Sequence, residues 1–153
     1  MEIWNPDDLL DAAAYLRGMA FHEAGHAVVA WSLNLPVGDI HIREIGAGDG
    51  GTQIASTADL SFIDRMAVCF AGIEAGVVFQ SPQPSWAGNG DRRMAFNLLM
   101  GMPEEHAEWL WNRAGVRASE LLVEHTDRVI RLAARLIEVH EVDAAEFLRL
   151  MGV

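Results

Sequence analysis

The pattern H-E-x-x-H at residues 22–26 constrains this sequence more than any other feature. It lies inside a largely apolar, helical run that we expect to extend from about Pro6 to Leu33, and a spacing of four puts His22 and His26 on one helix face, one turn apart. That is the geometry for holding one zinc ion between two imidazoles. Glu23 lies beside the same position and can act as the general base toward the attacking water. The motif therefore predicts a helix built around a metal centre; the alternative is a polar-faced helix with two ordinary histidines.

A catalytic zinc site ordinarily has three protein ligands and one open position, so a third ligand must come from another part of the chain. Asp91 is the candidate that its position favours, because it follows the turn Gly88-Asn89-Gly90 at the expected start of a helix. A carboxylate is held rigidly at such a place. The alternative is that Asp91 only caps this helix and has no part in metal binding.

The charge of the chain argues against two classes of protein. It carries 22 Asp and Glu against 11 basic residues, a formal net charge of -11. Nucleic-acid binding depends on clustered cations, so no nucleic-acid partner is expected. All 11 basic residues are Arg. A Walker A loop needs a Lys, so this sequence is not that of a conventional P-loop ATPase.

The single cysteine, Cys69, can form neither an internal disulfide nor a thiolate zinc cluster. We expect it to be a small buried hydrophobe in a protein of a reducing compartment. The first residues are acidic where a targeting peptide would be basic, and no stretch approaches 18 uninterrupted apolar residues. The expectation is a cytoplasmic protein without a membrane span.

Hydrophobic periodicity predicts a mainly α (α+β) fold, a helical domain with one small β-sheet or hairpin and the zinc helix near the N-terminus. The first helix is expected to be capped by Asn5, with a potential break near Gly18. Residues 39–45 and 52–55 are expected to form the hairpin around a glycine-rich turn. Further helices are expected at about 59–79, 91–100, 104–114, 117–141 and from a cap at Asp143 to Met151. No repeat or long linker divides the sequence, so residues 1–153 are expected to form a single domain.

The run Phe21–Val29 resembles the zinc helix of the FtsH-type, membrane-bound and ATP-dependent zinc peptidases, whose signature reads H-E-A-G-H-A. The similarity continues through residues 37–43 with the Gly-Thr pair at 51–52, through 70–79, through 87–91, where that family has its third zinc ligand, and through 121–146. The resemblance implies that His22, His26 and Asp91 are zinc ligands and that Glu23 is the base.

Two departures from the family pattern matter. The paired glutamates of the family fall near Ala75 and Gly76 here, which leaves Glu74 as the neighbouring carboxylate able to replace them. The ATPase module and the transmembrane helices of the family have no counterpart in these 153 residues. The chain therefore resembles a peptidase domain that stands alone.

The expected function is that of a zinc-dependent metallopeptidase, a metalloendopeptidase-like hydrolase with one Zn²⁺ per chain that cleaves peptides or unfolded protein segments. It would be ATP-independent by itself, and a partner ATPase would supply any unfolding of substrates. We expect the substrate to lie along the exposed edge of the small sheet near Ile40 to Ile45, because backbone pairing holds a peptide without demanding a sequence. The alternative is a catalytically inactive, zinc-binding, protease-like interaction module, and a small remainder is hydrolysis of a non-peptide bond.

The other conspicuous side chains are expected to be structural. His41 fits a solvated strand face, and the remaining histidines show no ligand spacing; they are His106, His125 and His140. Trp109 and Trp111 cannot share one helix face, so at most one belongs to the core. The other would suit a partner surface, as in a homo-oligomer.

Overall fold

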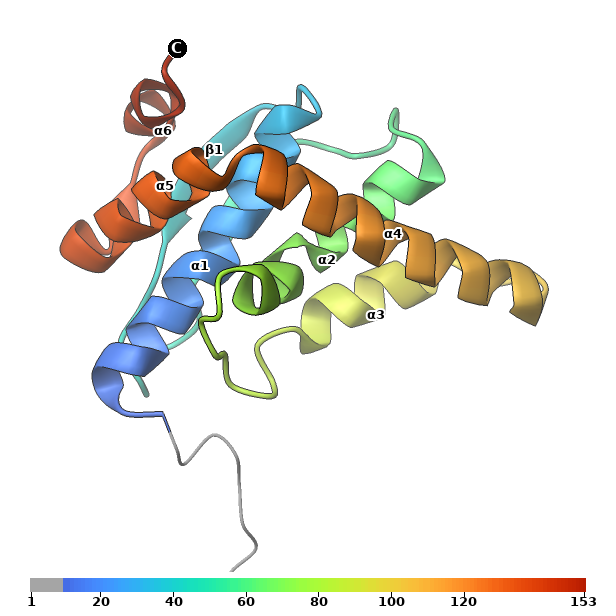
Figure 1. Ribbon diagram of the computed structural model, residues 1–153, viewed down its shortest axis with the longest axis horizontal. Helices are drawn as coiled ribbons and strands as arrows, with labels where there is room; N and C mark the ends of the chain where they lie inside the picture. The colour runs from blue at the N-terminus through green and yellow to red at the C-terminus, as the bar shows by residue number, and fades with distance from the viewer. Residues whose placement is uncertain (1–9) are drawn as a thin grey trace, which may run out of the picture.

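The computed structural model describes residues 10–153, and its architecture is mainly helical with one small antiparallel sheet (Figure 1), as the sequence predicts. The helices of this region are α1 (Ala12–Ser32), α2 (Phe62–Val78), α3 (Asn89–Leu98), α4 (Glu104–Glu124), α5 (Thr126–Val139) and α6 (Ala144–Met151). The strands are β1 (Val37–His41), β2 (Gly51–Ile54) and β3 (Glu141–Val142). Within this region no helix combines the length and the hydropathy needed to cross a membrane.

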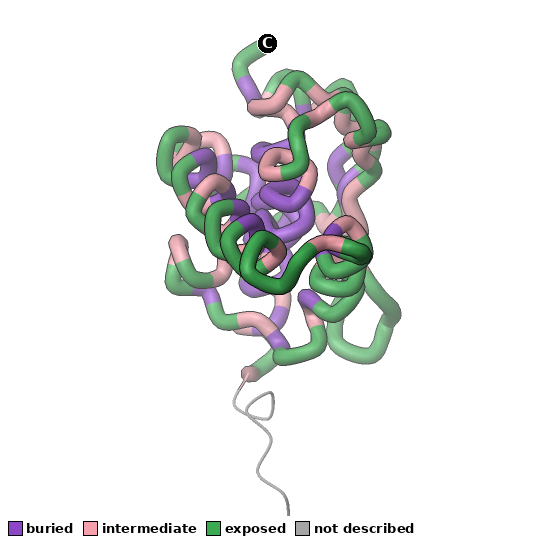
Figure 2. Tube along the Cα trace, turned by 90° about the vertical axis from the view of Figure 1, so that its right-hand side faces the viewer, coloured by how far each residue is buried: buried purple, intermediate pink, exposed green. Residues whose placement is uncertain are grey.

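Helix α1 forms the centre of the fold. It contacts α2, α4 and α5 as well as β1 and β2, and its residues 18–30 are all buried, inside a shell of more exposed segments (Figure 2). A helix that is apolar nearly all round is buried in this way. The side chain of Asp11 caps it by accepting a hydrogen bond of 2.8 Å from the Ala14 N–H, so the helix begins later than predicted; the predicted cap, Asn5, lies outside the described residues. The helix continues unbroken through Gly18.

The order of strands in the sheet is β2-β1-β3, and both pairings are antiparallel. The β1–β2 hairpin was expected, whereas β3 was not, because a strand of two residues leaves no alternating pattern. Ile40 faces Thr52 on one side and Val142 on the other. The exposed substrate-binding edge predicted near Ile40 to Ile45 is therefore wrong, since β1 is the central strand; the free edge beside α1 belongs to β2.

The segment between α2 and α3 packs closely against α1. A Cβ added at Gly18 would lie 2.2 Å from the carbonyl oxygen of Pro82, so only a glycine in α1 lets this backbone approach. The segment then turns into α3, whose first turn contains Asp91. Asp91 is thus inside the helix and not its N-cap. This arrangement places Asp91 next to the middle of α1.

The C-terminal helices differ from the prediction in where they break. We expected one helix to end at Ala114 and the next to begin at Arg117, but α4 runs straight through Gly115 and the chain bends at His125. The weak helix propensity of one glycine is overridden because α4 packs extensively against α2. The predicted last helix is confirmed, and the Asp143 side chain caps α6 by accepting from the Glu146 N–H.

The two tryptophans of α4 face different environments, as their spacing predicts. The ring of Trp111 packs edge-on against Phe70, with ring centroids 4.6 Å apart. Trp109 is exposed. Its expected role at a partner surface stays a prediction.

Candidate metal centre

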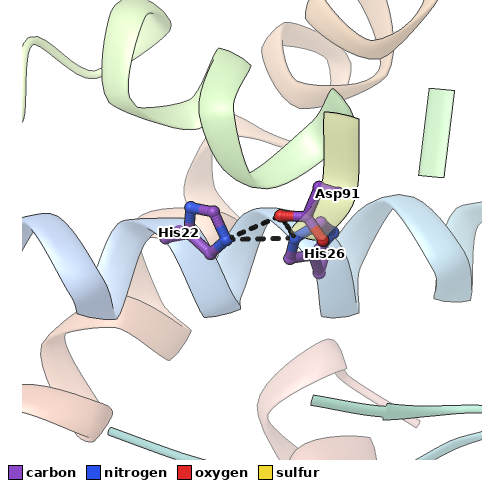
Figure 3. A group of neighbouring side chains, drawn as sticks. All are labelled: His22, His26 and Asp91. Carbon is purple, nitrogen blue, oxygen red and sulfur yellow. Dashed lines mark hydrogen bonds and ion pairs between the residues drawn. The ribbon is translucent and has the colours of Figure 1, made fainter. Parts of the chain in front are cut away.

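Three side chains from two helices converge on one another (Figure 3). His22 and His26 come from successive turns of α1, and Asp91 comes from the first turn of α3. Asp91 Oδ2 lies 3.1 Å from His22 Nε2 and 3.0 Å from His26 Nε2, and the two imidazole nitrogens are 3.2 Å apart. Both histidines are buried, and the Asp91 side chain is 24% exposed. The structure thus brings together the three residues that the sequence singled out as ligands.

The spacing of these three atoms fits one small metal ion. Bonds of 2.0–2.1 Å to a tetrahedral zinc place neighbouring ligand atoms about 3.3–3.4 Å apart. The observed separations of 3.0–3.2 Å are close to that value. Within the part of the chain that the structure describes, His22, His26 and Asp91 form the group able to hold a metal ion. Three protein ligands leave one coordination position for water or substrate, which is the arrangement of catalytic zinc sites.

The outer nitrogens of the two imidazoles fix which nitrogen faces the cluster. His26 Nδ1 donates to the carbonyl oxygen of Val68 at 2.8 Å. His22 Nδ1 donates to Gln83 Oε1 at 2.9 Å, and the Gln83 amide is oriented by its own donation to the Gly72 carbonyl at 2.8 Å. In the neutral form of each ring, with the proton on Nδ1, the lone pair of Nε2 is directed at the cluster. Both histidines are therefore held in the tautomer that binds a metal.

Gly72 leaves the space that the imidazoles occupy. A Cβ at this position would lie 2.6 Å from His26 Nε2 and 2.7 Å from both Cε1 and Nε2 of His22. No side chain larger than hydrogen fits there while the rings keep their places. The interior of α2 is thus shaped around the metal-binding group.

The electrostatics of the group stabilise positive charge between the three side chains. Burial lowers the pKa of His26, but the hydrogen bond to Asp91 and the nearby carboxylates of Asp91 and Glu23 raise it to about 9. For Asp91, burial raises the pKa, and the hydrogen bonds and charges of His22 and His26 outweigh it and hold that pKa well below the usual carboxyl range. The same two imidazoles and the same carboxylate would therefore stabilise either a proton or a metal cation at this position.

Glu23 lies beside the metal-binding group and is itself oriented. Its Oε1 is 3.9 Å from His22 Nε2, and its side chain is only 7% exposed. Thr52, on β2, donates its hydroxyl to Glu23 Oε2 at 2.6 Å. One carboxylate oxygen is therefore held by the sheet, and the other lies close to the imidazole nitrogen of His22 that faces the metal-binding group.

A cavity of about 660 Å³ opens in front of this group. Glu23, the three ligand candidates and Thr52 all line it, together with apolar side chains from α1, β2, α2, α3 and the segment before α3; these are Met19, Ile54, Val68, Trp86 and Met94. The site is thus accessible through this cavity. Cys69 also lines the cavity, and burial raises the pKa of its thiol to about 11, so it stays a neutral, buried thiol as expected.

The remaining histidines lie elsewhere. His125 packs edge-on against Trp31, and His106 stacks on Trp109. His41 lies in β1, and His140 ends α5 in a left-handed backbone conformation. None of them belongs to the metal-binding group formed within residues 10–153.

Glu74, considered as a replacement for the paired glutamates, does not reach the centre either. Its Oε2 accepts a hydrogen bond from the Ser119 hydroxyl, and it lines a different cavity. In contrast, Gln83, Gly72 and the contact of Thr52 with Glu23 are parts of the site that the sequence did not reveal.

Comparison with known proteins identified no relative. No protein family matches this chain, and no curated protein matches it. The geometry of the site must therefore carry the functional argument.

Proposed function

We propose that this protein is a zinc-dependent metallopeptidase that hydrolyses peptide bonds in peptides or unfolded protein segments. The observation that carries the proposal is the placement of a buried, oriented carboxylate next to a two-histidine, one-aspartate group at the floor of an open cavity. A structural zinc site is usually closed by a fourth protein ligand and needs no base. The similarity of Phe21–Val29 to the zinc helix of FtsH-type peptidases supports the same class of reaction.

Each residue has a defined part in the proposed reaction. His22, His26 and Asp91 would hold the zinc, which when bound supplies Lewis acidity to water and to the peptide carbonyl. Glu23 accepts the proton of the attacking water and later delivers it to the leaving amine. Thr52 keeps the second oxygen of Glu23 in place, so the carboxylate does not have to reorient between the two proton transfers.

The substrate is proposed to run along β2. This strand is the edge of the sheet that lines the cavity, through Gly51, Thr52 and Ile54. An extended peptide paired with such an edge gains backbone hydrogen bonds whatever its sequence. In a strand, successive N–H groups point to opposite edges, so Gln53→Pro and Ile54→Pro remove one donor facing β1 and one facing the substrate. The variant that loses the donor facing the substrate is expected to cleave peptides more slowly while its zinc content stays unchanged. Equal cleavage by both variants and the native protein contradicts this placement.

The proposed activity is tested by comparing the native protein with Glu23→Gln on unfolded casein. The isosteric amide keeps the size of the side chain and the contact with Thr52 but cannot accept the proton. We expect equal zinc content in both proteins and at least about a hundredfold lower cleavage rate in the variant, the usual scale of general-base catalysis. Zinc retained in both proteins without cleavage by either would favour the alternative, a zinc-binding interaction module.

Peptides and already unfolded segments are the proposed substrates because the cavity is a single open depression beside a sheet edge. A folded substrate has to be unfolded before a strand of it can pair with β2. A partner ATPase is the proposed source of that work, since no Lys is present in these 153 residues to build a Walker A loop.

A further inference from the structure

A second cavity, of about 850 Å³, lies between α2 and α4 and shares no lining residue with the cavity of the metal centre. Its wall comes from one face of α2, from α4 between Trp111 and Glu124, and from Arg92 of α3. Cavities of this volume, apolar with a few placed polar groups, are typical of small-ligand sites. The apolar part of the wall includes the packed rings of Phe70 and Trp111.

The polar groups of this cavity are predominantly acidic. Three carboxylates line it, those of Glu74, Glu120 and Glu124, against one guanidinium, that of Arg92. Glu74 is half-buried, and the Ser119 hydroxyl donates to its Oε2 at 3.0 Å. Its other oxygen, Oε1, faces the backbone of Gly115 and has no hydrogen-bond or ion-pair partner among the described residues. A carboxylate in such a setting suits a positively charged group on a ligand.

Gly115 keeps this cavity open in front of Glu74. Glycine inside a helix destabilises it relative to alanine, so packing is the usual reason for its presence. Here packing does not require it: a Cβ at position 115 would meet only Glu74 Oε1, at an ordinary contact distance of 3.7 Å. A larger side chain at this position would project into the space above the carboxylate.

We propose that this cavity binds a protonated amine carried on an apolar body, with the ammonium group against Glu74 and the apolar body against Phe70 and Trp111. An ammonium of this kind has two sources, a free small-molecule amine and the side chain of a Lys flanked by apolar residues in a peptide.

The test uses 2-phenylethylammonium and its neutral counterpart 2-phenylethanol, titrated into the full chain while the backbone amides of Gly115 and Ser119 are followed by NMR. We expect the cation to bind at least about tenfold more tightly than the alcohol, and Glu74→Gln to remove the difference. A parallel titration with the blocked tripeptide acetyl-Phe-Lys-Phe-amide distinguishes the two sources. Binding of the tripeptide indicates a peptide Lys, and binding of 2-phenylethylammonium without binding of the tripeptide indicates a free amine. Equal binding of cation and alcohol, or no shift from any of the probes at millimolar concentration, overturns the proposal.

Two variants at position 115 test the same site without the Glu74→Gln substitution, which could itself alter folding. Gly115→Leu is expected to occupy the space in front of the Glu74 carboxylate and to abolish binding of the cation there. Gly115→Ala fits the available space, so it is expected to bind the cation as the native protein does and to unfold at a higher temperature. Undiminished binding by Gly115→Leu would contradict the proposed position of the ligand. Zinc content is expected to be the same in all these variants, because the two cavities are separate.

Discussion

Replacing Gly72 with alanine is expected to remove metal binding while leaving the fold intact. The new Cβ would lie 2.6 Å from His26 Nε2, and the ring would have to move by about 0.8 Å to restore the 3.4 Å of ordinary contact. His22 is met in the same way, through both Cε1 and Nε2. The atoms concerned are the ends of two side chains, so the rings turn away and the backbone keeps its place.

The size of the effect follows from the tolerance of metal bonds. Ligand distances are held to about ±0.2 Å, several times less than the displacement. Loss of a single outer-sphere hydrogen bond already lowers metal affinity by about 10–100-fold. Displacement of two ligands should cost at least about 100-fold, which corresponds to about 2.7 kcal/mol.

The assay is competition for zinc against a chromophoric chelator, together with thermal unfolding in excess EDTA. In EDTA the Gly72→Ala variant should still unfold cooperatively, because the cost of overpacking the two buried rings, about 1–3 kcal/mol, is partly offset by the better helix propensity of alanine, about 1 kcal/mol. Gly90→Ala is the matched control. Gly90 lines the same cavity next to Asp91, and a Cβ there meets no atom within 4 Å. Zinc binding by Gly72→Ala at native affinity would refute the assignment of His22 and His26 as ligands.

Three further predictions concern the residues around the metal centre. Gln83→Ala removes the acceptor of the His22 Nδ1 proton and should weaken zinc binding about 10–100-fold in the same competition assay; an unchanged affinity would contradict the orienting role of Gln83. Thr52→Val should lower kcat/KM for peptide cleavage at full zinc occupancy, and Thr52→Ser should keep the native value, because the hydroxyl donates the hydrogen bond to Glu23; equal kinetics for the two variants would show that the contact is unimportant. In the metal-free protein, burial raises the pKa of the Cys69 thiol to about 11, so alkylation by iodoacetamide at pH 8 should be at least about tenfold slower than that of a free cysteine; reaction at the rate of a free cysteine would refute this.

Local pattern was enough to predict the helical core and half of the site. The four-residue spacing of His22 and His26 determines their relative position as soon as the segment is helical, because the α-helix has 3.6 residues per turn. The turn before Asp91 indicated a carboxylate at the start of a helix. The structure then brings that carboxylate to both imidazoles across 65 and 69 residues of sequence.

Other features depend on the tertiary fold and could not be predicted from the local sequence pattern. Gln83 is 61 residues from its partner His22, and its position follows from how the segment after α2 passes over Gly18 of α1. β3 forms only because its two residues meet β1 after α5 ends. The helix α4 continues through residues 115–116, where the sequence predicted a break, because packing of α4 on α2 outweighs a glycine propensity penalty of about 1 kcal/mol.

The most direct test of the account is the zinc content per chain of the native protein and of Asp91→Ala, measured by elemental analysis after mild dialysis. Asp49→Ala is the control, because Asp49 lines the same cavity but lies outside the metal-binding group formed by the described residues. We expect close to one zinc per chain in the native protein and in the control, and a marked loss in Asp91→Ala. A native protein that binds no zinc would contradict the metal centre, and with it the proposed peptidase.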